Sequence, residues 1–221
     1  MLSESRKGFL VVADISGYTR FLADTELEHA NGILKDLFDA IVPVFENSVE
    51  ISNFMGDAIF AHNDDMTILN SQYMLDFSKD VYNSFADKKE LININTSCVC
   101  SACKHMKELD LKLFVHYGEY INQSLQGRQE LAGSDVNSLF RLMKNDVVEK
   151  TNIEPYLLVT QQALDAMALS DYAQNKHTLS QSYEHVGEIH FVVDDLSKYW
   201  KMHREAKRYY IEPNERLLFD E

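Results

Sequence analysis

The sequence is poor in cysteine and proline, and it lacks long apolar runs. Its 221 residues include three cysteines and three prolines. The cysteines fall in one stretch, CVCSAC, which is unlike the spaced pairs of an extracellular disulfide framework. The apolar run that begins after Lys7 is interrupted at Asp14, so it is too short for a signal-peptide core or a membrane span. We therefore expect a cytoplasmic protein that has no membrane partner.

Basic residues are also scarce. The chain has 21 lysines and arginines against 35 aspartates and glutamates, a formal net charge of −14. A surface field of this sign repels polyanions, so we do not expect nucleic acid as a partner. A small phosphorylated ligand can still bind if divalent cations lie between its phosphates and the acidic side chains. Nucleotide chemistry in this chain would thus depend on metal ions.

The chain has no linker rich in Pro, Gly and Ser, and no internal repeat. Hydrophobic residues make up 45% of it, which is enough for a packed core. A chain of 221 residues fits one domain. We predict a single α/β domain over residues 1–221, with a cysteine-rich insertion at about 96–106 and a C-terminal helical extension at about 197–221.

Short apolar runs predict strands, and apolar residues that recur every three or four positions predict helices. The runs VEISNFM and AIFAH flank Gly56-Asp57, where glycine can adopt the positive φ of a two-residue hairpin turn. Further strands are predicted at GFLVVADI, LKLFVHY, EPYLLVT and GEIHFVV, and helices at about 27–45, 66–86, 134–143, 161–169 and 197–209.

Two acidic residues stand next to glycines at the ends of strand-like runs. Asp14 follows the first run, and Asp57 occupies the hairpin turn, so both can lie at one end of a sheet. Two converging carboxylates repel each other unless a cation sits between them, and hard divalent metals prefer oxygen ligands. The alternative is that Asp14 caps the next turn and Asp57 merely fills its own.

A second polar pair lies on the predicted helix over 134–143. Asn137 and Arg141 are four residues apart and share one helix face, away from the apolar positions of that helix. Arginine there can stabilise charge on a phosphoryl group, and asparagine can hold a sugar oxygen. The alternative is an ordinary solvated face.

Four motifs together resemble one family. FLVVADISGYTRFL, NFMGDAIFA, KLFVHYGE and GSDVNSLFRL resemble, in the same order, the motifs of class III nucleotide (adenylate/guanylate) cyclase catalytic domains, and they span about residues 8–145. The resemblance implies a ferredoxin-like α/β (α+β) fold, in which helices flank a mixed, mostly antiparallel sheet. It also implies conversion of a nucleoside triphosphate, ATP by default, to a 3′,5′-cyclic nucleotide and pyrophosphate.

The resemblance assigns a role to each matching position. Asp14, Asp57 and the Ile15 carbonyl would bind two Mg²⁺ or Mn²⁺ ions, and the turn Ser16, Gly17, Tyr18 and Thr19 would offer N–H groups to the triphosphate. Asn137 would orient the ribose, and Arg141 would offset transition-state charge. In the family these two halves come from different subunits, which implies a homodimer with two composite sites.

The sequence departs from the family pattern in the base pocket and near its end. Asn53 replaces a base-reading lysine, and Glu130 occupies the position of its partner, so the nucleobase stays open. The late phosphate-binding lysine has no equivalent in EHVGEIHFVVDDLSKYW. The charge could come from a basic helix that is otherwise a solvated or dimer-contacting face: Lys198, Lys201, Arg204, Lys207 and Arg208. These departures favour an alternative, a weak or inactive nucleotide-binding or dimerisation module.

The cysteine segment has no counterpart in the cyclase pattern. Cys98, Cys100, Cys103 and His105 have the ligand types of a Cys₃His zinc site, which would order an inserted loop. Buried free thiols or a redox-sensitive cluster are the alternatives. A third function hypothesis is therefore a thiol or zinc sensor on a cyclase-like scaffold.

Overall fold

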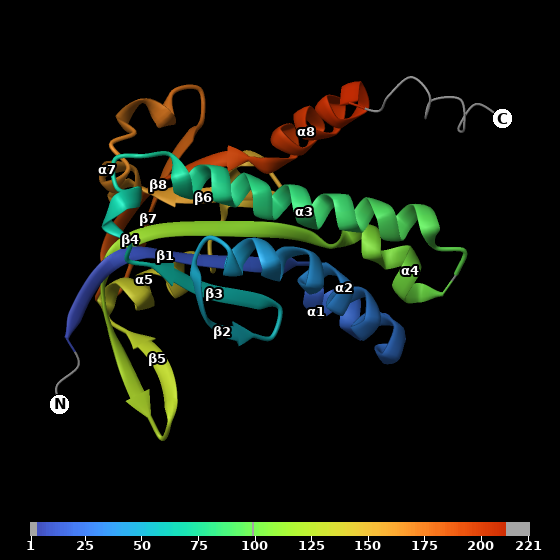
Figure 1. Ribbon diagram of the computed structural model, residues 1–221, viewed down its shortest axis with the longest axis horizontal. Helices are drawn as coiled ribbons and strands as arrows, with labels where there is room; N and C mark the ends of the chain where they lie inside the picture. Colours follow the sequence, from blue (N-terminus) through green and yellow to red (C-terminus); the bar gives the residue numbers. More distant parts are fainter. Residues whose placement is uncertain (1–3, 99, 211–221) are drawn as a thin grey trace.

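The computed structural model describes residues 4–98 and 100–210, and a mixed sheet forms its centre (Figure 1). The strand order is β2-β3-β1-β4-β6-β8-β7, and β5 pairs with β4. β4 and β6 pair in parallel, whereas the other pairs of the described sheet are antiparallel. The predicted fold class is confirmed. The strands are β1 (Ser5–Ser16), β2 (Glu50–Met55), β3 (Ala58–Asn63), β4 (Asp110–Leu125), β5 (Arg128–Ala132), β6 (Tyr156–Thr160), β7 (His177–Tyr183) and β8 (Gly187–Asp195).

The central strand β1 is buried on both faces. Successive side chains of a strand point to opposite sides of the sheet. Val11 and Ala13 therefore join one hydrophobic cluster, and Leu10 and Val12 join the other. This explains why the run from Phe9 to Ala13 is continuously apolar instead of alternating.

Helices cover both faces of the sheet. The larger cluster is covered by α1 (Tyr18–Ala23), α2 (Leu27–Glu46), α3 (Tyr73–Asn95), α4 (Ser101–His105), α7 (Gln161–Ala166) and α8 (Leu196–Tyr210). The opposite cluster is covered by α5 (Ser134–Leu142) and α6 (Val147–Thr151). Short 3₁₀ turns complete the chain: η1 (Met66–Ile68), η2 (Met106–Glu108) and η3 (Ser170–Ala173). No helix in the described ranges has both the length and the apolar character needed to cross a membrane.

The helix predicted over 66–86 is divided in the structure. Residues 66–68 form η1, whose first turn is capped because the Asp65 side chain accepts a hydrogen bond from the Thr67 N–H. Asn70 then adopts a left-handed conformation with φ 57°, which ends that turn. α3 starts three residues later and continues to Asn95.

The cysteine-rich segment predicted at about 96–106 connects α3 to β4 and contains α4. The helix predicted at 197–209 is α8. The part of the predicted extension beyond Tyr210 lies outside the described residues. The extent of the domain over 1–221 stays a prediction.

Candidate functional site

Asp14 and Asp57 lie beside each other at one end of β1. The Cα of Asp14 pairs with that of Ala58, the first residue of β3, and the Ile15 N–H donates to the Asp57 carbonyl at 3.1 Å. The turn between β2 and β3 contains Gly56, whose φ of 67° favours glycine, followed by Asp57. Sheet register thus brings together two acids that are far apart in the sequence.

The two carboxyl groups share an unfavourable electrostatic environment. Burial, together with the charge of Asp57, raises the pKa of Asp14 to about 6, while Lys112 on β4 acts in the opposite direction. Burial also raises the pKa of Asp57. Carboxylates in such positions are stabilised by an added cation, and their oxygen atoms suit a hard divalent ion.

The turn after β1 requires glycine. Gly17 has a φ of 82°, and a Cβ at this position would lie 2.9 Å from the Glu108 carbonyl oxygen. The Gly17 carbonyl accepts the Phe21 N–H, which begins α1 at Tyr18 and Thr19. Ser16 is buried beside this turn. The N–H groups at the start of a helix have no intrahelical acceptor, so this turn can donate to an anion.

Asn137 and Arg141 project from α5 away from the core. Val136, Leu139 and Leu142 of that helix are buried, whereas Asn137 and Arg141 are exposed. Both line a cavity of about 760 Å³, whose other side is the β7–β8 turn with His185 and Val186. The arrangement presents an amide and a guanidinium to an open space large enough for a nucleotide-sized ligand.

The acid pair and the Asn/Arg pair do not share that cavity. Its lining comes from α5, Lys144 and the β7–β8 turn, and it includes neither Asp14 nor Asp57. Figure 1 shows α5 toward the end of the sheet where β1 begins, whereas α1 follows the other end of β1. Within one chain the two halves of the predicted site are therefore separate.

A network that joins the buried His116 and Thr160 to the partly exposed Asp135 fixes the start of α5. The Asp135 carboxylate accepts the Glu119 N–H at 2.6 Å and lies 3.4 Å from His116 Nε2, and His116 Nδ1 lies 2.9 Å from Thr160 Oγ1. The nearby His116 side chain lowers the pKa of Asp135 despite partial burial. A Cβ at Gly118 would lie 2.3 Å from this carboxyl group, so glycine leaves room for it. Sequence reasoning missed Asp135, which positions the helix that carries Asn137.

Asn53 and Glu130 lie on exposed positions of contacting strands. Asn53 of β2 pairs with Phe60 next to an irregularity in the β2–β3 register, and Glu130 of β5 pairs with Gln123 of β4. β2 and β5 are in contact. Their role in reading a base stays a prediction.

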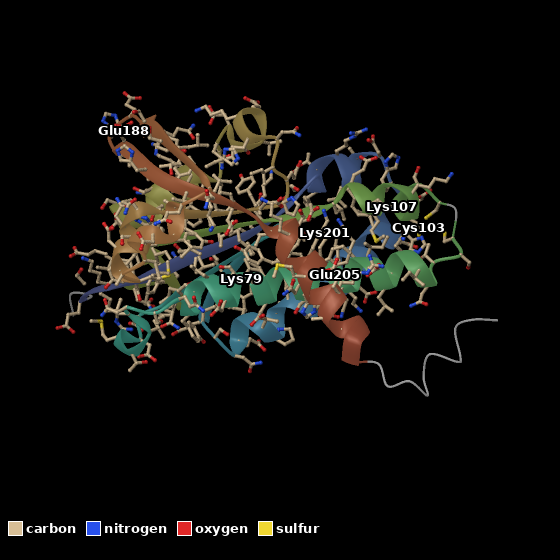
Figure 2. All side chains as sticks on the ribbon, turned by 90° about the horizontal axis from the view of Figure 1, so that it is seen from above. Lys79, Cys103, Lys107, Glu188, Lys201 and Glu205 are labelled. Atoms are coloured by element: carbon tan, nitrogen blue, oxygen red, sulfur yellow. The ribbon has the colours of Figure 1, made fainter. Side chains whose placement is uncertain are left out.

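Two basic residues of α8, Arg204 and Lys207, contact the neighbouring helix α3, and Figure 2 shows the two helices side by side. Arg204 pairs with Glu90 at 2.5 Å, and Lys207 pairs with Asp87, which also accepts from Trp200 Nε1 at 3.0 Å. These contacts lower the pKa of Asp87 despite its partial burial. Arg204 and Lys207 therefore neutralise acids of the neighbouring helix.

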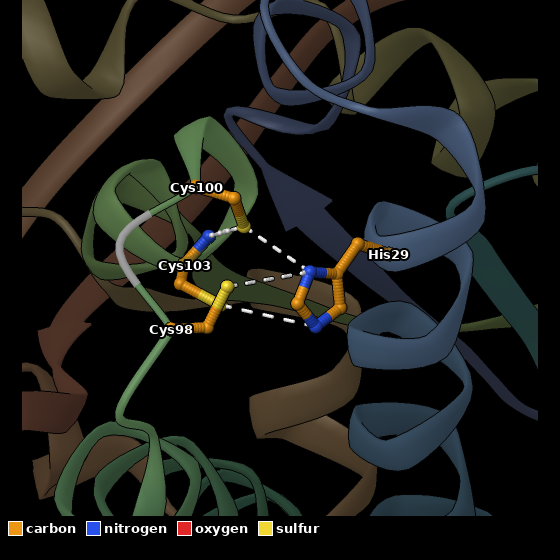
Figure 3. Close-up of side chains that lie close together, drawn as sticks. All are labelled: His29, Cys98, Cys100 and Cys103. Carbon is orange, nitrogen blue, oxygen red and sulfur yellow. Dashed lines mark hydrogen bonds between the residues drawn. The ribbon is translucent and has the colours of Figure 1, made fainter.

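The cysteines surround a histidine from another part of the chain. His29, in the first turn of α2, points its ring at Cys98, Cys100 and Cys103 (Figure 3). His29 Nδ1 lies 3.1 Å from Cys100 Sγ and 3.9 Å from Cys98 Sγ, and Nε2 lies 4.0 Å from Cys103 Sγ. The four ligand atoms all lie within 4.8 Å of one another.

His105 is not part of this group, in contrast to the prediction. Its Nδ1 lies 2.9 Å from Glu108 Oε1, one turn further along the same segment. His105 follows Cys103 by only two residues on the same short helix, so its side chain points away from the cysteine sulfurs. The sequence signal for His29 is weak, because an exposed histidine beside the buried Ala30 is typical of an ordinary solvated helix face.

Solved structures with the same fold are nucleotide cyclases. A guanylyl cyclase, Cya2, superposes with a TM-score of 0.66 at 15% identity, covering 88% of this chain and 95% of that one. The guanylate cyclase domain of RhGC from Catenaria anguillulae, in complex with GTP, gives 0.60 at 14% identity, covering 87% and 99%. The adenylyl cyclase CyaB from P. aeruginosa gives 0.55 at 13% identity, covering 88% and 97%. The chain is thus a divergent domain with the class III cyclase fold.

Two matches concern the sequence itself. An uncharacterized protein of Mycobacterium tuberculosis, Rv2561/Rv2562, is 26% identical over 168 residues, which covers 75% of this chain and 72% of that protein. A family model matches residues 34–152, and this segment holds Asp57, Asn137, Arg141 and all three cysteines. Since that match covers more than half of the chain, the chain belongs to the family described as "Protein of unknown function (DUF2652)".

Proposed function

We propose that the protein converts a nucleoside triphosphate to its 3′,5′-cyclic monophosphate and pyrophosphate, as a metal-dependent homodimer. The observation that carries this proposal is the meeting of Asp14 and Asp57 beside the Gly17 turn, at the end of β1 in a cyclase-type fold. Two mutually repelling acids next to a turn that can donate to phosphates suit a metal–polyphosphate complex.

Asp14, Asp57 and the Ile15 carbonyl would hold two divalent ions, Mg²⁺ or Mn²⁺. The donor set fits, because it consists of oxygen atoms and its carboxyl groups are partly buried next to each other. When bound, the ions would lower the pKa of the ribose 3′-hydroxyl and would offset negative charge on the leaving pyrophosphate. The backbone N–H groups from Ser16 to Thr19 would bind the phosphates.

Asn137 and Arg141 of the partner subunit would complete each site. Within one chain they line a cavity that lacks both acids, so a two-fold dimer is the arrangement in which each cavity meets an acid pair. Asn137 would hold the ribose in position for in-line attack, and Arg141 would offset charge on the reacting phosphorus. Asn53 and Glu130 would contact the base, with ATP as the default substrate.

The first experiment measures cyclic product by mass spectrometry after incubation of the protein with Mn²⁺ and each of the four ribonucleoside triphosphates. The proposal expects product with at least one nucleotide, and none with Asp57→Ala. Absence of product above the Asp57→Ala background with all four nucleotides would contradict it.

The second experiment mixes inactive Asp14→Ala and Arg141→Ala chains. About half of the dimers are then mixed and each holds one intact site, so we expect about a quarter of the wild-type rate per chain. The control mixes Asp14→Ala with Asp57→Ala, which damage the same half and should not restore activity. Mixed dimers that recover nothing in the first case would exclude the composite site.

A nucleotide-binding module without turnover is the second candidate. It is supported by the ion pairs of α8, since Arg204 and Lys207 contact α3 and so do not replace the missing phosphate-binding lysine. Calorimetry with Mn²⁺ and the same nucleotides separates the candidates. If the wild type binds nucleotide but forms no cyclic product, and Asp57→Ala does not bind nucleotide, the protein is a binding module.

A further inference from the structure

We propose that His29, Cys98, Cys100 and Cys103 bind one Zn²⁺ ion as a closed structural site. Cys98 and Cys100 lie in the connection between α3 and α4, Cys103 lies on α4, and the imidazole comes from the first turn of α2. Figure 3 shows the ring of His29 facing all three cysteines. A site of this composition is separate from the oxygen-donor site at Asp14 and Asp57.

The spacing of the four ligand atoms suits a tetrahedral zinc ion. With Zn–S distances of about 2.3 Å and Zn–N distances of about 2.0 Å, neighbouring ligand atoms lie about 3.5–3.8 Å apart. An imidazole binds a zinc ion through one nitrogen, and His29 Nδ1 lies 3.1 Å from Cys100 Sγ and 3.9 Å from Cys98 Sγ. One ligand atom from each of the four residues lies within 4.8 Å of the others. The group is therefore slightly wider than a zinc coordination sphere, and small side-chain movements would close it around the ion.

The chemistry of the ligands favours zinc over the harder ions. Thiolate and imidazole ligands select zinc or other soft and borderline metals, whereas magnesium and calcium require oxygen. Four protein ligands leave no open position for a substrate, which is typical of structural sites. A disulfide explains the cluster less well, because it would use two thiols and leave the third thiol and His29 without a role.

Backbone and side-chain groups around the sulfurs support their role as ligands. The Cys103 N–H points at Cys100 Sγ at 3.5 Å, and Thr96 Oγ1 lies 4.0 Å from Cys103 Sγ. Hydrogen bonds of this kind orient thiolate ligands and spread their negative charge. Cys103 is buried, so its position is fixed by packing between α4 and the core.

The proposed ion would join the start of α2 to the segment that supports the Gly17 turn. The Ala102 N–H donates to Glu26 at the start of α2, at 3.3 Å. The helix α4, which holds Cys103, is followed directly by η2. The last residue of η2, Glu108, places its carbonyl against Gly17 and its side chain 3.5 Å from Arg20. Zinc would thus hold α2, the cysteine segment and this turn together.

The test measures metal content and does not depend on nucleotide turnover. The full chain is purified under reducing conditions and dialysed, and its zinc is counted by mass spectrometry. We expect one zinc per chain in the wild type, and a loss of more than about 100-fold in zinc affinity in His29→Ala and in Cys103→Ser. His105→Ala is the matched control and should keep its zinc.

Cobalt provides a second readout that needs no variant. Added to reduced, metal-free wild-type protein, Co²⁺ should give the intense near-ultraviolet absorption of thiolate ligation and the visible bands of a tetrahedral ion. His29→Ala should change these bands, and His105→Ala should not. Wild-type protein that holds no stoichiometric zinc and shows no thiolate–cobalt band would overturn the proposal, as would equal zinc loss in both histidine variants.

Discussion

The chain contains two regions suited to metal ions, and they are built in different ways. Asp14 lies on β1 and Asp57 lies in the turn directly before β3, so the register of β1 and β3 fixes both backbones. The cysteine/histidine cluster combines one short segment with His29, which is 69 residues away from Cys98 and belongs to a helix. Sheet register can be inferred from local sequence, whereas the contact between α2 and α4 depends on how helices pack.

The two regions also differ in their energetics without metal. The acids at the sheet end are buried near each other, so the charged form is disfavoured and the pKa of Asp14 rises to about 6. The three cysteines are free, and only Cys103 is buried in the core, so the cluster is more open to water than the acid pair. An empty acid pair therefore destabilises the fold, whereas an empty cysteine cluster mainly forgoes the stabilisation that an ion would add.

The largest predicted effect concerns turnover. Asp57→Asn should lower the rate of cyclic nucleotide formation by at least about 100-fold, because it removes charge that holds the metal–phosphate complex. Zinc content should stay at the wild-type level, since the two regions share no ligand. A variant that keeps more than a tenth of the wild-type rate would contradict the assignment of Asp57.

Loss of one thiol should have the next largest effect, and on stability. With zinc at a thousandfold excess over its dissociation constant, a loss of 100-fold or more in affinity should cost Cys103→Ser at least about 2.7 kcal/mol of unfolding free energy relative to wild type. Urea unfolding with zinc and with a chelator measures this. The difference between the two proteins should shrink in the chelator, and an equal difference in both conditions would argue against a bound ion.

Removing the buried charge of Asp14 should stabilise the metal-free protein. In chelator at pH 7, Asp14→Asn should be more stable than wild type by up to about 3 kcal/mol, since a shift in pKa from 3.8 to about 6 costs about 1.4 kcal/mol per unit. The native state binds the proton more tightly, so wild-type stability falls as the pH rises from about 4 to about 6.

Urea unfolding in chelator across that pH range checks this prediction. The advantage of Asp14→Asn should disappear below about pH 4, where the Asp14 carboxyl group is protonated in both states. If Asp14→Asn is less stable than wild type at pH 7, the acid pair is not under electrostatic repulsion.

The smallest effect is expected at His105. Its contact with Glu108 lies at the surface, so His105→Ala should change the unfolding free energy by less than about 1 kcal/mol, with or without zinc. His29→Ala should match it in chelator and be clearly less stable with zinc. Thermal unfolding of both variants, with zinc and with a chelator, therefore shows whether His29 or His105 contributes to zinc-dependent stability.

The sequence predicted the parts of the molecule that depend on local pattern. The hairpin at Gly56-Asp57 is present because a glycine with positive φ joins two short apolar runs, and the strand from Gly8 to Ile15 is buried as its composition indicates. The exposed face of α5 with Asn137 and Arg141 follows from helical spacing. In each case neighbours in sequence decide the structure.

Contacts between distant segments could not be predicted in the same way. His29 contacts the cysteines because α2 packs beside α4. The hydrophobic periodicity of either segment does not predict that contact. Asp135 can be assigned a role in positioning α5 only when the structure shows its contacts with His116 and Glu119 of β4. The choice of His105 failed because proximity in the chain is a poor guide to which way a side chain points on a short helix.

The separation of the acids from the α5 cavity has a consequence for how the protein would behave at different concentrations. A monomer would contain two half-sites and no complete site. The rate of cyclic nucleotide formation per chain would then fall on dilution below the dissociation constant of the dimer, in proportion to the fraction of chains that are dimeric. The amount of protein present would itself act as a threshold, without any attached sensor.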